Sequence, residues 1–278
     1  MSFFVAKGRL EDYEDIIDFG NYVFNIDFPT LLPKLYKNHA ETAEHHYLVK
    51  EGHRIKAMVG SFPLSLKVLD QSLKIRGIGT VSVHRYSRGS GYMKILMDNA
   101  VKEMRNEGCD LAVLGGQRQR YEYWGFTPCG ININLDFNSS NARHAKIDLV
   151  DNYEFIEYNK CSTEDLLKAV ELHNSQTIHA VRNKANFIAI SSSWNNKIFF
   201  IYSNSEFCGY ICTSPNNEKI SEILLANPNE IDKVILSYTE KLSLKNTSVV
   251  LHMHRSEEFL KLSRLCEEYS INSSCNML

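Results

Sequence analysis

The stretch from Val81 to Lys94 constrains this chain more than any other segment. It has the pattern of a strand end, then a turn that contains Arg88, Gly89 and Gly91, then the first turn of a helix. Backbone N–H groups converge in such a turn, and the helix start adds partial positive charge. The segment therefore predicts a site for a ligand that carries phosphate.

The flanking sequence supports this order of elements. Apolar residues spaced three and four apart predict an amphipathic helix over 93–104, which Gly108 would end as a left-handed cap. The runs 74–83 and 110–114 predict strands on either side. Neither the P-loop pattern nor the dinucleotide-binding Gly-x-Gly-x-x-Gly pattern occurs here, which excludes those two kinds of nucleotide site.

Two motifs together resemble the GCN5-related N-acetyltransferases, the GNAT superfamily. In that family a turn of the form Arg/Gln-x-x-Gly-x-Gly/Ala binds the pyrophosphate of acetyl-CoA. The turn here runs from Arg88 to Met93, and Met93 departs from the Gly or Ala of the last position. The segment Tyr121-Glu-Tyr-Trp-Gly-Phe126 is similar to the family's Tyr-x-x-x-Gly-Phe segment. The resemblance implies that Tyr121 is the general acid that protonates the leaving thiolate.

This resemblance implies an α+β fold with a mixed, mostly antiparallel sheet flanked by helices, in two tandem copies. It looks most like the Eis-type branch without that branch's third domain. It also implies acetyl-CoA as the donor substrate and no metal. Strand amides would hold the pantetheine and polarise the thioester carbonyl, and turn amides would hold the pyrophosphate. The residues that the resemblance assigns to acetyl-CoA are Val81, Ser82, Val83, Arg88, Gly89, Ser90, Gly91, Tyr92, Met93, Lys94 and Gly116.

Other polar residues leave alternatives open. Tyr123 lies two residues from Tyr121 and could be confused with it. A phenol at either position could protonate a CoA thiolate, because the two groups are of similar basicity. His84 could deprotonate an amine, but a residue at that position more often only shapes the turn, so no base is assigned. His252 and His254 could share a strand face, yet no third metal ligand accompanies them.

Length and composition set further limits. A chain of 278 residues corresponds to about two domains. The net charge of −2 predicts no binding to nucleic acid or to anionic membranes. Seven cysteines without a Cys-x-x-Cys pair, and the lack of an evident leader or of a long apolar run, lead us to expect a cytoplasmic location.

A polar segment, 138–141, suggests a boundary between two domains, 1–138 and 139–278. We expect the first to be the catalytic GNAT domain and the second a degenerate GNAT-like domain, because its predicted elements follow the same order. After the strand predicted at 219–226, the arginine–glycine turn is replaced by a segment with Pro228, which lacks an amide. The second half is therefore not expected to bind CoA productively, and Trp194 within it is expected to lie against the core.

The function expected from these features is acetyl-CoA-dependent transfer of an acetyl group to a primary amine of a small molecule or peptide. Two alternatives stay open. One is a non-catalytic module that binds or senses acyl-CoA, and the other is a transferase with an aminoacyl donor. The near-neutral charge argues against the tRNA contacts that an aminoacyl-tRNA donor needs. Neither the acceptor nor the oligomeric state follows from the sequence.

Overall fold

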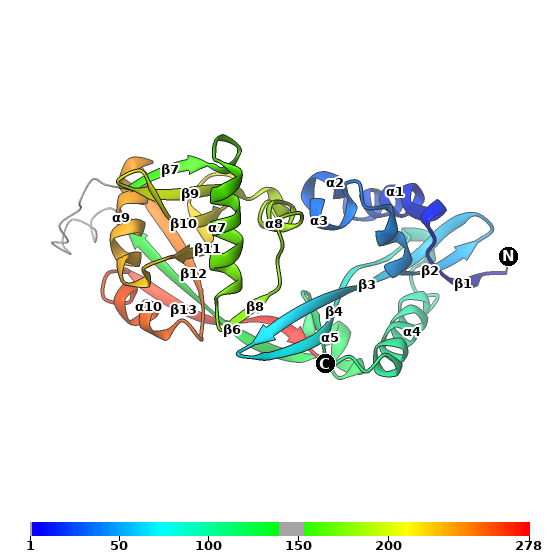
Figure 1. Cartoon of the computed structure of the whole chain (residues 1–278). Coiled ribbons are helices and arrows are strands. Elements are labelled where there is room, and N and C mark those ends of the chain that lie inside the picture. Colours follow the sequence, from blue (N-terminus) through cyan, green and yellow to red (C-terminus); the bar gives the residue numbers. More distant parts are fainter. Residues whose placement is uncertain (1, 139–152) are drawn as a thin grey trace. The chain divides into compact units, whose positions relative to one another are not determined.

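The computed structural model describes residues 2–138 and 153–278, and it has the mixed α+β architecture that the sequence predicts (Figure 1). Of the polar segment 138–141, residues 139–141 lie outside the described residues. None of the described helices combines the length and the apolar character needed to cross a bilayer.

The chain forms two compact units. The first comprises Met1–Cys129 and Cys275–Leu278, and the second comprises Gly130–Ser274. These units are defined by packing, and the division into domains 1–138 and 139–278 stays a prediction.

The first unit is an antiparallel sheet with one parallel pair. Its strand order is β1-β2-β3-β4-β5, followed by the last residues of β13 (Glu268–Met277), and β4 with β5 is the parallel pair. The elements in chain order are β1 (Phe4–Lys7), η1 (Leu10–Asp12), α1 (Tyr13–Phe24), α2 (Phe28–Leu31), α3 (Pro33–Tyr36), η2 (Ala40–His45), β2 (His46–Glu51), β3 (Arg54–Val68), β4 (Gln71–Val83), η3 (Arg85–Ser87), α4 (Tyr92–Asn106), β5 (Leu111–Leu114), α5 (Arg118–Tyr121) and η4 (Glu122–Trp124).

Alternation along the strands of the first unit builds two cores on opposite faces of its sheet. Val49 and Val59 pack with Leu96 and Met97 of α4, so α4 covers one face. The residues next to those valines, such as Leu48 and Met58, face the other way and pack against α1, α2 and α3. The predicted helix over 93–104 and its cap at Gly108 are confirmed, since Gly108 has a φ of 64° directly after α4.

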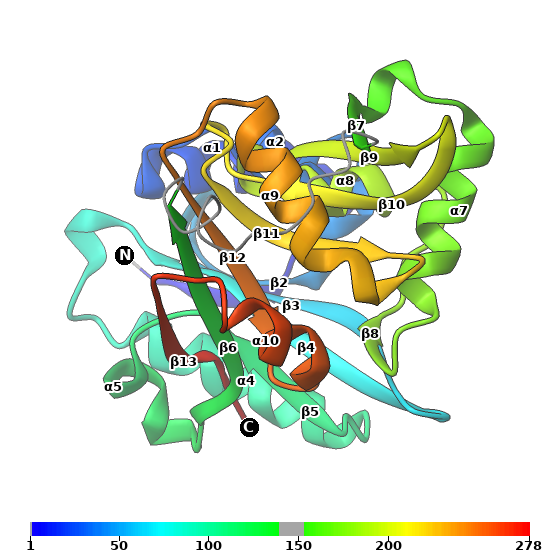
Figure 2. The ribbon, with the colours of Figure 1, turned by 90° about the vertical axis from the view of Figure 1, so that its left-hand side faces the viewer.

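The second unit follows the same order of elements. Its strand order is β6-β12-β11-β10-β9-β7, with β11 and β12 parallel. Figure 2 shows α9 lying across β10 and β11, and α7 packs on the opposite face of these strands. The elements are β6 (Thr127–Asn138), β7 (Tyr153–Glu157), η5 (Tyr158–Lys160), α7 (Thr163–Asn174), β8 (Ile178–Ala180), α8 (Phe187–Ser191), η6 (Ser193–Asn195), β9 (Lys197–Ser203), β10 (Glu206–Thr213), β11 (Lys219–Leu225), η7 (Pro228–Glu230), α9 (Ile231–Lys241), β12 (Asn246–His252) and α10 (Ser256–Leu262).

Each unit completes its sheet with a strand from the other half of the sequence. In the second unit, β6 pairs antiparallel with β12 over the register Asn246↔Asn138 to His252↔Asn132. In the first unit, the end of β13 pairs antiparallel with β5 through Asn276↔Leu114 and Met277↔Val113. These exchanges satisfy strand edges that would otherwise stay unpaired.

One expectation about the second unit was wrong. Trp194 does not lie in a core: it is 61% exposed and has a φ of 64° in the turn before β9. Three serines precede it and two asparagines follow it, and these polar residues favour a surface turn over burial of the indole.

Candidate active site at the end of strand β4

The parallel pairing of β4 and β5 ends before β4 does. It runs from Ile75↔Leu111 to Ile78↔Leu114, whereas β4 continues to Val83. The last residues of β4, including the predicted Val81, Ser82 and Val83, therefore extend beyond this pairing. A sheet that opens in this way leaves backbone groups available to an extended ligand.

The predicted turn follows directly. Gly89 and Gly91 have φ values of 85° and 76°, and no atom lies within 4 Å of a Cβ built on either residue. These glycines are therefore needed for backbone conformation and not for space. Gly91 is the N-cap of α4, no side chain caps the helix, and Ile95 N–H donates to the Gly91 carbonyl. The amides of the first turn, from Tyr92 to Lys94, precede that bond and so lack an intrahelical partner.

The side chains of this first turn have separate roles. Tyr92 is buried and donates its hydroxyl to Glu51 at 3.0 Å. Met93 is half-buried against the core below α4. Lys94 is exposed and pairs with Asp98 at 2.7 Å. Because the Met93 side chain packs against this core, the replacement of the family's Gly or Ala by Met changes packing and leaves the backbone amide in place.

Only some of the exposed cations of this region pair with a carboxylate of the described residues. Arg88 is exposed, and Arg85 stacks over Tyr86 at 4.6 Å. Arg118 pairs with Glu122 at 3.2 Å across one turn of α5. The turn therefore keeps positive charge for an anionic ligand.

Tyr121 lies in the same apolar cluster as the end of β4 and the start of α4. It is 8% exposed, and its ring meets Phe126 edge-on at 6.4 Å between centroids. Its hydroxyl makes no hydrogen bond to any described residue. Burial raises the pKa of Tyr121, against the opposing effect of the Arg120 charge. The phenol is thus held protonated with its proton uncommitted, as a general acid requires.

Gly116 touches the candidate acid. A Cβ on Gly116 would lie 3.0 Å from Cε2 of Tyr121, and its φ is 150°. The Gly116 carbonyl accepts a hydrogen bond from Asn276 Nδ2 at 3.0 Å. Sequence reasoning missed Asn276, because no local pattern marks a contact between residues so far apart in the chain.

The other tyrosine of this segment has a different setting. Tyr123 is 68% exposed and lies edge-on to Trp124 at 5.2 Å. Trp124 donates its indole N–H to Asp98 at 2.8 Å. A surface hollow of about 360 Å³ lies here along α4, lined by Asp98, Val101, Lys102, Arg105, Asn106, Tyr123 and Trp124.

His84 is built into the turn by contacts with two tyrosines. Its ring stacks on Tyr22 at 5.1 Å, and its Nδ1 accepts the Tyr86 amide at 3.3 Å. Burial and the nearby charges of Lys56 and Arg85 lower its pKa. In the neutral tautomer that accepts at Nδ1, Nε2 carries the proton. His84 therefore shapes the turn, and the base stays unassigned.

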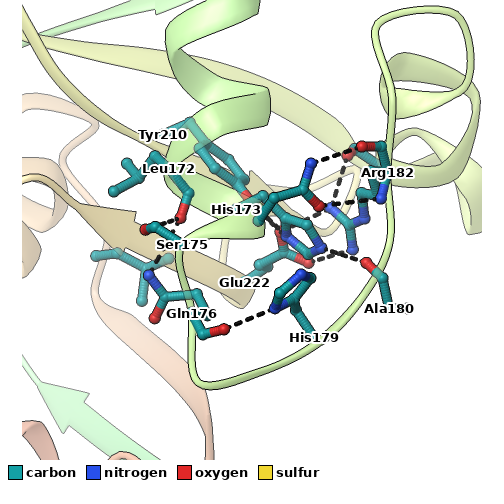
Figure 3. Close-up of polar contacts among 12 residues, drawn as sticks. Leu172, His173, Ser175, Gln176, His179, Ala180, Arg182, Tyr210 and Glu222 are labelled. Carbon is teal, nitrogen blue, oxygen red and sulfur yellow. Dashed lines mark hydrogen bonds and ion pairs between the residues drawn. The ribbon is translucent and has the colours of Figure 1, made fainter. Parts of the chain in front are cut away.

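The second unit has a different chemistry at the strand that precedes its own helix (Figure 3). Arg182 makes two bonds to Glu222 of β11, Nη1 to Oε1 at 2.8 Å and Nη2 to Oε2 at 2.7 Å. The Tyr210 hydroxyl also donates to Glu222, and His173 Nδ1 lies 3.1 Å from that hydroxyl. His173 Nε2 bonds the Ala180 carbonyl at 2.8 Å. The chain's own cation thus neutralises this partly buried carboxylate.

His252 is the last residue of β12 and His254 lies beyond it, so the two do not share a strand face. His252 and His254 stack at 5.9 Å between centroids. Within residues 2–138 and 153–278, no group of three metal-ligating side chains is assembled.

Comparisons with known proteins agree with this geometry. Residues 5–129 match the family model of the acetyltransferase (GNAT) domain. Among curated proteins, none matches the sequence. Solved structures match over the whole chain. They include a probable N-acyltransferase of unknown function from Enterococcus faecalis, with a TM-score of 0.74 and 14% identity over 100% of this chain and 72% of that one.

Two further structures share the fold. A GCN5-related N-acetyltransferase from Kribbella flavida has a TM-score of 0.71 and 12% identity, over 99% of this chain and 71% of that one. Eis1 from Mycobacterium abscessus has a TM-score of 0.66 and 10% identity, over 99% and 73%. The opened sheet, the glycine turn and the helix start define a GNAT N-acetyltransferase fold. Residues 5–129, a little under half of the chain, match the GNAT acetyltransferase domain, and the likeness to Eis1 is a likeness of fold.

Proposed function

We propose that this protein transfers an acetyl group from acetyl-CoA to a primary amine. The observation that carries the proposal is that residues from the end of β4, the start of α4 and Tyr121 belong to one apolar cluster. At this place β4 extends beyond its pairing with β5, and no side chain caps α4. The pyrophosphate would accept hydrogen bonds from the backbone amides of 89–94, and the pantetheine would lie along residues 81–83. The amine would attack the thioester, and Tyr121 would protonate the departing sulfur.

The hollow along α4 fits the remaining part of the donor. Tyr123 and Trp124 offer aromatic faces, and Lys102 and Arg105 offer positive charge. An adenine that stacks on an aromatic ring and a 3′-phosphate beside cations match this lining. Dephospho-CoA should consequently bind more weakly than CoA, and increasingly high salt should remove the difference.

Calorimetry with acetyl-CoA tests the donor directly. Binding in the low micromolar range is expected, and absence of heat at tens of micromolar would overturn the proposal. A thiol-release assay over polyamines, aminoglycosides, amino acids and peptides then identifies the acceptor. Tight binding without transfer to any of these amines would instead favour a non-catalytic acyl-CoA-binding module.

A further inference from the structure

Strand β4 carries a bulge where it leaves β5. In the β3–β4 ladder, Gly60 is opposite Gly79 and Met58 is opposite Ser82. Thr80 and Val81 of β4 therefore face the single residue between Met58 and Gly60 on β3. Such an extra residue bends a strand and redirects its backbone groups.

The bulge holds Thr80 in an unfavourable conformation. Its φ is 51°, and a β-branched residue in the left-handed region is a genuine outlier. Backbone strain of this kind costs on the order of 1–3 kcal/mol, and it persists only where the surroundings enforce it. The contacts of Thr80 show what enforces it here.

The Thr80 side chain is in contact with a histidine from across the sheet. Its Oγ1 donates its one proton to the Gly79 carbonyl at 2.8 Å, so the 3.5 Å approach of His46 Nε2 to that oxygen is a packing contact. His46 is opposite Gly60 in the β2–β3 ladder. A Cβ on Gly60 would lie 2.4 Å from Cζ of Phe62 and 2.9 Å from Thr80 Oγ1. The missing side chain at Gly60 therefore makes room for the Phe62 ring and for the Thr80 hydroxyl beside His46.

His46 is itself fixed in one tautomer. Its Nδ1 lies 2.9 Å from the Thr42 carbonyl, which can only accept, so Nδ1 carries the proton. Nε2 is then an acceptor, and the Tyr36 hydroxyl donates to it at 3.0 Å. His46 and Tyr36 are 0% and 1% exposed. Burial lowers the pKa of His46 to about 4, so the ring stays neutral at physiological pH.

From this arrangement we infer that His46 and Tyr36 are positioning residues, which hold the bulge at Thr80 so that the amides of 81–83 face the thioester. The inference rests on the proposed acetyl transfer. Neither side chain touches the donor, because both are buried among α3, η2 and the strands. Ser82 supports the same backbone, since its hydroxyl donates to the Thr80 carbonyl at 3.0 Å.

The test uses Tyr36→Phe, which removes one hydroxyl, with Tyr13→Phe as the matched control. Tyr13 belongs to the same core and donates to the Tyr36 backbone carbonyl without bonding to His46. In Tyr36→Phe, the amides of Ser82 and His84, which face β3 in the ladder beside the bulge, should exchange hydrogen roughly tenfold faster, because the local opening free energy falls. Tyr13→Phe should leave these amides unchanged. Equal exchange in the two variants would overturn the inference.

Kinetics give a second readout. With acetyl-CoA and the amine found in the panel, Tyr36→Phe should lower kcat about tenfold, and acetyl-CoA affinity should stay within about twofold, since misplaced reacting groups slow chemistry more than binding. In a Thr80→Gly background, where φ is unstrained, the Tyr36→Phe effect on kcat should largely disappear. An undiminished effect there would contradict action through Thr80. If the wild type does not bind acetyl-CoA, the proposed function fails, and the exchange comparison still decides whether the bulge is held by His46 and Tyr36.

Discussion

Arg182 and Glu222 form a two-pronged ion pair in the second unit, with both guanidinium–carboxylate distances below 3 Å, at 2.8 and 2.7 Å. The side chain of Arg182 is 11% exposed and that of Glu222 is 26% exposed. A bidentate pair of this kind is directional as well as charged. It ties the segment before α8 to β11, on the face that α7 covers.

Removing one partner should destabilise the second unit strongly. Arg182→Met leaves the partly buried Glu222 carboxylate without its cation. A loss of about 3 kcal/mol is expected, the lower end of the range for broken buried pairs, because Glu222 keeps some exposure to water. Urea unfolding followed by circular dichroism measures the change. Lys168→Met is the control, because Lys168 is exposed and its ion pairs with Glu164 and Asp165 lie within one helix, so their loss should leave the unfolding midpoint nearly in place. A similar loss of stability in the two variants would contradict a stabilising role for the Arg182–Glu222 pair.

Stability of the second unit should also depend on pH through Glu222. Burial alone would raise its pKa, but the bonds from His173, Arg182 and Tyr210 and the Arg182 charge outweigh burial, so the pKa lies well below its usual range. A carboxylate whose pKa is lowered by folding stabilises the folded state at pH values above its unfolded-state pKa of about 4.3. This stabilisation is lost as the pH falls toward the folded-state pKa. The stability difference between wild type and Glu222→Gln should therefore be largest near pH 7 and shrink by pH 3. A difference that stays constant over this range would contradict the prediction.

Tyr121→Phe should lower turnover about 100-fold, the lower range for loss of a general acid, with little change in acetyl-CoA affinity. Tyr123→Phe is the matched control, since it also loses a phenol but lies at a 68% exposed position. Steady-state kinetics and calorimetry separate the two effects. Comparable turnover in both variants would remove Tyr121 from the mechanism.

Gly91→Ala should weaken both folding and donor binding. Alanine at a φ of 76° costs about 1–2 kcal/mol in backbone strain, although no atom obstructs its Cβ. Gly115→Ala is the control, because its site is equally open and its φ lies outside the left-handed region. Thermal unfolding and acetyl-CoA titration should distinguish the two, and equal behaviour would mean that the turn tolerates rearrangement.

Met93→Ala should keep acetyl-CoA affinity within about twofold, because every non-proline residue supplies the same amide. The half-buried side chain contributes only to the core below α4. Its removal should cost about 1 kcal/mol of stability. A tenfold loss of affinity would show that the side chain itself contacts the donor.

Much of the first unit was predictable because its signals are local. Helix periodicity, the Gly108 cap and the glycine turn each depend on residues within a few positions of one another. In the second unit, the start of α7 is an equally local feature, since the N-cap Ser162 accepts the Asp165 amide with its Oγ at 3.1 Å. Short elements such as β1, β8 and α10 carried too little periodicity to be predicted.

The sequence by itself determined the turn, its two positive-φ glycines and the tyrosine that follows, because conformational freedom and hydroxyl chemistry belong to single residues. Tertiary structure decided the rest. It alone exchanged β6 and β13 between the sheets, paired Arg182 with Glu222, and brought His46 over Gly60 to Thr80. These relationships depend on strand register between distant segments, and register is set by the packing of whole sheet faces and not by any local pattern.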